Sequence, residues 1–239
     1  MQRRGSSANN KQTMIWILFI GIALLSYAVQ ANLQRKFKHF SREPLTSGLT
    51  GREVAEKMLH DNGIYNVTVI STPGQLTDHY NPTNQTVNLS EGVFNSTSVA
   101  AAAVAAHECG HAVQHATAYG PLRLRSALVP VVSMASQVVS WILLAGILLV
   151  QTFPALLLFG IGLFAMTTLF SVITLPVEID ASRRATVWLQ RAGITSNHEQ
   201  PMAVSALRSA AYTYVVAALS SLATLIYYVL IFMGSQRDE

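Results

Sequence analysis

Four apolar runs, each long enough to cross a lipid bilayer, constrain this chain more than any other feature of its sequence. A membrane-spanning helix needs about 20 apolar residues, and the runs cover residues 14–33, 129–151, 154–176 and 210–233. Only 12% of the residues are charged and the mean hydropathy is positive, which few soluble domains show. Because the second and third runs almost touch, they form a tight helical hairpin. The sequence predicts a mainly α integral membrane protein with four transmembrane helices.

The first run has features of both a cleaved signal peptide and a retained anchor. Basic residues precede an apolar core, as in a signal peptide. The run is long, however, and the basic cluster that follows it at residues 35–39 is typical of a stop-transfer flank. We therefore interpret residues 14–33 as a retained anchor, with a polar, disordered tail at 1–13 and a short tail at 234–239.

The region between the first two spans, residues 34–128, carries a motif with metal chemistry. His107 and His111 are four residues apart, so on a helix both imidazoles project from one face and can bind one ion. Glu108 follows the first His and can act as the general base on a metal-bound water. An alanine-rich stretch favours a helix over about 97–119. The motif predicts one Zn²⁺ per chain, held in a small α+β, zincin-like catalytic region.

Three features in and near the motif have to be weighed against simpler explanations. Two His and a Glu can also lie on the solvated face of a helix, but here alanines flank them on both sides. Cys109 is rotated away from the His face, so we interpret it as a small buried residue. His115 shares the face of His111, yet it is about 12 Å along the axis from His107. His115 is therefore assigned to packing or to the support of a ligand.

A catalytic zinc usually has three protein ligands, so a further ligand has to come from outside the motif. The next cluster of carboxylates is Glu178 and Asp180, at the end of the third span and the start of the segment 177–209. The hairpin brings this cluster back beside the motif. We favour Glu178 as ligand, with its helix dipole as the alternative explanation, and Asp180 as an acceptor that orients a His ring. Arg183 and Arg184 are candidates for binding a carboxylate or an oxyanion, although membrane-flanking charge also explains them.

Two short alternating segments, residues 66–70 and 85–90, predict strands before the motif helix. An extended substrate can pair with an exposed strand edge through backbone hydrogen bonds. The polar segment between the strands contains Asp78, His79 and Tyr80, which are candidates for the wall of a substrate cleft. The alternative, which we favour slightly, is a turn in which Asp78 caps local amides.

The distribution of charge predicts sidedness and excludes one class of partner. Residues 34–128 and 177–209 share one side of the membrane and hold twelve Lys and Arg, against four on the other side. The positive-inside rule therefore places the catalytic side in the cytoplasm, although Arg3, Arg4 and Lys11 pull the other way. The net charge of +4 comes from residues that flank the spans, so it is no signature of nucleic-acid binding.

These motifs together resemble a known family. The residues are His107 to Gln114, Leu76 to Tyr80 upstream, and Leu175 to Ala185 downstream, and the chain looks like the YugP-like neutral zinc metallopeptidases of bacterial membranes. That resemblance implies an integral membrane zinc peptidase with His107, His111 and Glu178 as ligands and Glu108 as acid/base. A more distant similarity is to the HtpX-like proteases, whose Glu-x-x-x-Asp pattern becomes Glu178 to Ser182 here.

The sequence thus predicts a gluzincin-like, membrane-anchored zinc endopeptidase that acts on a peptide or protein, membrane proteins included, in the bacterial plasma membrane. Partner subunits are left open. The alternative is an adaptor or scaffold in which zinc only braces the helices. A protease with its motif inside a spanning helix is excluded, because only about nine apolar residues precede His107.

Overall fold

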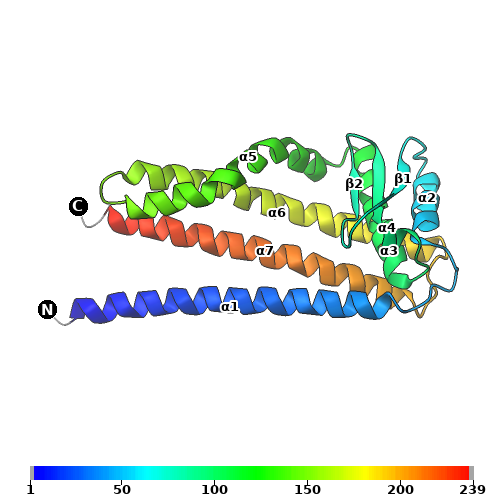
Figure 1. The fold of residues 1–239 in the computed structure, drawn as a ribbon, viewed down its shortest axis with the longest axis horizontal. Coiled ribbons are helices and arrows are strands. Elements are labelled where there is room, and N and C mark those ends of the chain that lie inside the picture. The colour runs from blue at the N-terminus through cyan, green and yellow to red at the C-terminus, as the bar shows by residue number, and fades with distance from the viewer. Residues whose placement is uncertain (1–2, 237–239) are drawn as a thin grey trace.

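Four long helices, with a small head at one end, make up the computed structural model of this chain (Figure 1). The structure describes residues 3–236, and side chains from residue 16 onward. All four helices are long and apolar enough to cross a membrane. Both termini lie at the end away from the head (Figure 1). The long helices are α1 (Arg3–Phe40), α5 (Gly120–Leu148), α6 (Pro154–Arg191) and α7 (Gln200–Ser235).

These helices extend beyond the predicted spans. Helix α1 begins at Arg3, where we expected a tail through residue 13, because adding a residue to an existing helix is far easier than starting one. Helix α6 runs through Pro176, which we had placed at the end of a span. A proline removes one backbone hydrogen bond, and a bundle of packed helices tolerates this loss. Glu178 therefore lies within a helix, which removes the helix dipole as an explanation for it.

The head consists of three short helices and a three-stranded sheet. Strand β3 (Thr86–Ser90) is central, with β1 (Thr68–Thr72) parallel on one side and β2 (His79–Asn81) antiparallel on the other. The two predicted strands are confirmed with small shifts, and β2 is an addition within the segment that we interpreted as a turn. The helices are α2 (Gly51–Asp61), α3 (Glu91–Phe94) and α4 (Val99–Ala116).

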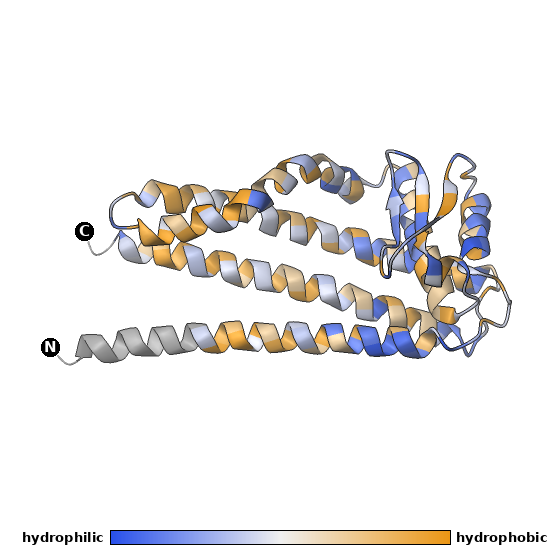
Figure 2. Cartoon of the chain, in the orientation of Figure 1, coloured by the Kyte–Doolittle hydropathy of each residue, from blue (hydrophilic) through white to orange (hydrophobic). Residues whose placement is uncertain are grey.

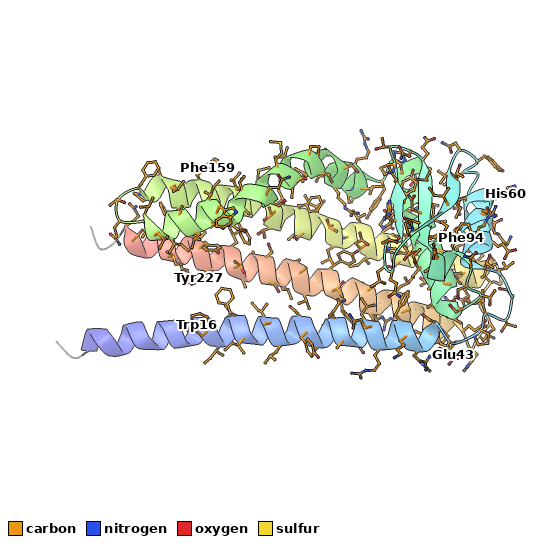
Figure 3. The ribbon with its side chains drawn as sticks, viewed as in Figure 1. Trp16, Glu43, His60, Phe94, Phe159 and Tyr227 are labelled. Atoms are coloured by element: carbon orange, nitrogen blue, oxygen red, sulfur yellow. The ribbon has the colours of Figure 1, made fainter. Side chains whose placement is uncertain are left out.

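Helix α4, which carries the motif, is the centre of the head. Its alanines are almost all buried and pack against α2, α6 and α7, because small side chains let helices approach closely. Ser98 caps its first turn by accepting from the amide of Ala101. Figure 2 shows hydrophilic residues gathered on the head and apolar ones along the long helices. Figure 3 places Trp16, Phe159 and Tyr227 on those helices and His60 and Phe94 in the head.

A buried carboxylate joins the head to the loop between α6 and α7. Glu199 is 4% exposed and accepts from the amide and hydroxyl of Thr46 and from the amide of Ser196. Burial opposes its ionisation, but these donors lower its pKa overall. These contacts hold the loop at Thr46 against the start of α7, which is a structural role.

Candidate metal centre

Helices α4 and α6 bring the three predicted ligands together. Glu178 Oε2 lies 3.3 Å from His107 Nε2 and 3.6 Å from His111 Nε2. Four ligands at zinc bond lengths of 2.0–2.2 Å are about 3.4 Å apart in a tetrahedron. The two imidazole rings come from successive turns of α4, with centroids 4.8 Å apart. The spacing of the three donor atoms therefore suits one zinc ion.

The glutamate oxygen at the centre of this group has no other use in the fold. The side chain of Glu178 is only 4% exposed, and its Oε2 has no hydrogen-bond donor within the described residues. Leaving a buried carboxylate oxygen without a partner costs free energy, which a bound cation offsets. Two imidazole nitrogens and a carboxylate oxygen are also ligands that zinc prefers. These observations fit a metal ion at this point.

The hydrogen bonds of Gln114 fix the orientation of His111. Gln114 is fully buried, and its amide group donates to the carbonyl of Val177 and to Asp180. Its oxygen therefore faces His111 Nδ1, 3.1 Å away, so that this nitrogen carries the proton and donates. The lone pair of His111 Nε2 then points toward Glu178, as a metal ligand requires.

His107 is held in the same way by a hydroxyl group. Ser182 Oγ lies 3.1 Å from His107 Nδ1, which leaves Nε2 facing Glu178. Ser182 is four residues after Glu178, on the same face of α6, at the position where the HtpX-like pattern has Asp. The contact that orients the ring is present, with a neutral oxygen in place of a carboxylate. Asp180 contacts neither ring and acts on His111 through Gln114.

The carboxylates around His111 favour positive charge. Burial by itself lowers the pKa of His111, but the neighbouring carboxylates of Glu178 and Glu108 raise it overall. A metal cation in the same place would be stabilised by the same charges.

The side chain of Glu108 extends from the motif helix α4 to the edge strand β2. It is 9% exposed, and its Oε2 accepts the backbone amide of Tyr80 at 3.0 Å. That hydrogen bond holds one oxygen of the carboxylate and leaves Oε1 as the oxygen that can accept a proton. The amide comes from β2, which sequence analysis did not predict.

The remaining predicted candidates divide into four groups. Asp78 accepts from the amide and hydroxyl of Ser90 at the end of β3, so its contacts are structural but are made to a distant strand and not to local amides of a turn. The Tyr80 hydroxyl pairs with His115 Nδ1 at 2.8 Å, which gives His115 a supporting role at the edge of the sheet. Arg184 binds Asp180 and stacks on Tyr119. The other two, His79 and Arg183, are exposed, and the His79 ring contacts the carbonyl of Thr77.

The contact between Arg125 and Glu178 could not be seen in the sequence analysis. The Nη1 of Arg125 donates to Glu178 Oε1 at 3.2 Å, which leaves only Oε2 facing the imidazoles. In the sequence, Arg125 is one of the twelve basic residues that flank the spans on the head side. The signal that was available is its place at the start of α5, on the same membrane side as Glu178. Cys109, in contrast, agrees with its interpretation, since its Sγ donates to the carbonyl of Ala55 and burial raises the pKa of the thiol.

Gly110 sets the distance between the two helices that carry the ligands. A Cβ atom at this position would lie 2.6 Å from the backbone oxygen of Ala181 on α6, closer than such contacts occur. We therefore expect Gly110→Ala to push α6 away from α4, which separates Glu178 from the imidazoles. The expected cost is about 1–3 kcal/mol of stability, together with weaker zinc binding. Thermal unfolding and a chelator competition assay measure the two effects.

The control is Gly162→Ala on α6, where a Cβ meets nothing within 4 Å. This variant should keep the zinc affinity and melting temperature of the wild type, or gain slightly in helix stability. Wild-type zinc binding by Gly110→Ala would contradict the role of the close helix contact.

Helices of membrane-spanning length with a His-His-Glu site and a neighbouring carboxylate define a membrane protein with a site for one divalent metal ion. Residues 15–233 match the family model described as "Putative neutral zinc metallopeptidase", and the chain belongs to this family. It is also 43% identical over 226 residues to the "Putative membrane protease YugP" of Bacillus subtilis (strain 168). That match covers 93% of this chain and 98% of the relative. No solved structure matches the chain.

Proposed function

We propose that this protein is a membrane-anchored zinc endopeptidase in which Glu108 carries the proton. The observation that supports it most is the buried, unpartnered Oε2 of Glu178, which lies between the Nε2 atoms of His107 and His111. Zinc held by these three residues would lower the pKa of a bound water and polarise a peptide carbonyl. Family membership supports the same conclusion.

Glu108 is the residue that takes and returns the proton. Its Oε2 is held by the Tyr80 amide, so Oε1 accepts the proton from the attacking water without a change of rotamer. The same oxygen then gives the proton to the departing amine. Because the Tyr80 donor belongs to the backbone, no substitution at position 80 other than proline removes it.

The edge of the sheet is the proposed binding place for the substrate backbone. Strand β3 lies between β1 and β2, so β1 and β2 are the two edge strands, and the outer edge of β2 is the one that faces Glu108. The Tyr80 amide points away from β3 toward Glu108, and the carbonyl of the same residue faces the same way in an antiparallel pair. Because Glu108 holds the Tyr80 amide, an extended peptide at this edge would pair through the Tyr80 carbonyl, and it would lie beside Glu108 and the ligands.

Removal of zinc is the test. Purified full-length protein in detergent should lose cleavage of an unfolded polypeptide such as casein when treated with 1,10-phenanthroline. Activity should return with Zn²⁺ and not with Mg²⁺, because Mg²⁺ prefers six oxygen ligands. Cleavage that is insensitive to the chelator would contradict the proposal.

We further propose that the head faces the cytoplasm of a bacterial cell. The excess of Lys and Arg on the head side of the four helices supports this orientation, and the relative from Bacillus subtilis supports a bacterial plasma membrane. A cysteine placed at exposed Lys57 on α2 should be protected from a membrane-impermeant maleimide in intact cells and react after lysis. Labelling in intact cells would reverse the orientation.

A further inference from the structure

The lengths of the charge-free helix segments give the depth of the metal site in the membrane. Helix α6 has no charged residue from Pro154 through Val177, about 36 Å of helix, and its first charge is Glu178. The hydrocarbon core of a bilayer is about 30 Å thick, and the headgroup layer adds about 5–8 Å on each side. With the hairpin turn placed at one face of the hydrocarbon and α6 along the bilayer normal, Glu178 lies about 6 Å beyond the other face, at the depth of the headgroups.

The other three helices place the membrane boundary at the same level. The residues between Arg125 and the hairpin turn on α5 carry no charge, and neither do those of α7 beyond Arg208. Helix α1 is uncharged from Trp16 until Arg35. Arg125 contacts Glu178 directly, and Lys36 of α1 donates to Ser205 of α7. The charged residues at the head end of each charge-free segment therefore mark the membrane boundary on that side. The metal site lies at this boundary.

The edge strand lies on the membrane side of the head. In Figure 1, β2 is the strand on the side of the long helices along the molecule's long axis, and β1 is the strand toward α2. The free edge of β2 is the edge that faces Glu108, through the amide of Tyr80. A peptide paired with this edge lies between the head and the bilayer, and it would have to reach headgroup depth.

From this placement we propose that the substrate is a membrane protein, cleaved in an extended segment next to one of its own transmembrane helices. The inference rests on the proposed peptidase function. A segment that leaves the bilayer is already at the depth of Glu178 and His107, and tethering raises its concentration at the site. A folded soluble protein has to bring a loop down into the headgroup layer, beneath the head. Anchored chains are therefore favoured over free ones.

The cleavage test uses a single-span reporter with a flexible tail of about 40 residues, randomised as a pool so that no one sequence decides the result. Wild-type protein with zinc and Glu108→Gln are each reconstituted with this reporter in liposomes, or supplied with the same tail lacking its span. Mass spectrometry locates the cuts. We expect them within about ten residues of the span, which reach about 33 Å when extended. The free tail should be cut at least about tenfold more slowly.

The outcomes separate the substrate class from the peptidase function. Cuts spread evenly along the tail, or equal rates for the free tail, would refute the substrate class and leave the peptidase standing. If neither form is cut above the level of Glu108→Gln, the peptidase function and this inference both fail.

The depth itself has a readout that does not depend on activity. A fluorophore on Ser126→Cys, next to Arg125, should be quenched most by nitroxides on lipid headgroups. The same label on Ser140→Cys should be quenched by nitroxides on acyl chains, and on Lys57→Cys by neither. All three positions are exposed, so a thiol-reactive label can reach them. The native Cys109 is buried and does not compete for the label. A Ser126 label that behaves like that of Ser140 or Lys57 would refute the assigned depth.

Discussion

Glu108→Gln is expected to abolish peptide hydrolysis, with a fall in rate of about 10²–10⁴-fold or more, while zinc remains bound. An amide has the shape of the carboxylate and still accepts the hydrogen bond from the Tyr80 backbone. It cannot take a proton from water at neutral pH, so only the proton transfer is lost. Zinc content by elemental analysis and the rate of cleavage, measured on the same preparation, separate these effects.

The matched control is Glu53→Gln, a carboxylate on the exposed face of α2 that caps its own helix. It should keep full activity. A Glu108→Gln protein that binds zinc and still cleaves at the wild-type rate would remove Glu108 from the reaction. The adaptor hypothesis predicts that the gene for Glu108→Gln complements a deletion strain as well as the wild-type gene does. The peptidase hypothesis predicts that the variant fails to complement it.

Two parts of the architecture could be predicted because they are local in the sequence. The spacing of His107 and His111 is set by the helix period, and the four long helices follow from hydropathy alone. The position of Glu178 could be predicted in one further step. Helix α5 starts on the side of the membrane that holds the motif, and a tight hairpin must bring α6 back to that side. The structure brings these three residues within 4.8 Å of one another.

The parts that sequence analysis missed depend on partners that are distant in the chain. Strand β2 has three residues, too few to show alternation, and it exists through its pairing with β3. Ser182 and Arg125 look like ordinary polar residues at a membrane boundary until α5 and α6 are folded together. Gln114 had a local signal, because a lone amide on an alanine-rich helix, one turn from His111, has to find a partner when buried.

The arrangement around the ligands combines one charged contact with two neutral ones. Both imidazoles are oriented by neutral oxygens, from Ser182 and Gln114, and the carboxylate of Glu178 is paired with Arg125. Neutral partners add no negative charge beyond Glu178 and Glu108, so a zinc ion here would keep more of its positive charge than beside orienting carboxylates. We infer that the site is built to polarise its substrate.

Glu178→Gln is expected to lower zinc affinity by more than about 100-fold, because even the loss of a residue that orients a ligand costs about 10–100-fold. An amide oxygen carries no charge to offset that of the metal. Wild-type protein should gain about 2.7 kcal/mol of stability when zinc is present at 100 times its dissociation constant. At the same zinc concentration the variant should gain less than about 0.5 kcal/mol. Thermal unfolding with and without zinc measures the difference.

Ser182→Ala calibrates this result, since it removes the oxygen that orients His107 and leaves all three ligands in place. It should lose about 10–100-fold in affinity, between the wild type and Glu178→Gln. Asp180→Asn, one step further away through Gln114, should lose less than Ser182→Ala. Wild-type affinity in Glu178→Gln would mean that another group is the third ligand. The buried Oε2 would then lack the cation on which the proposed chemistry depends.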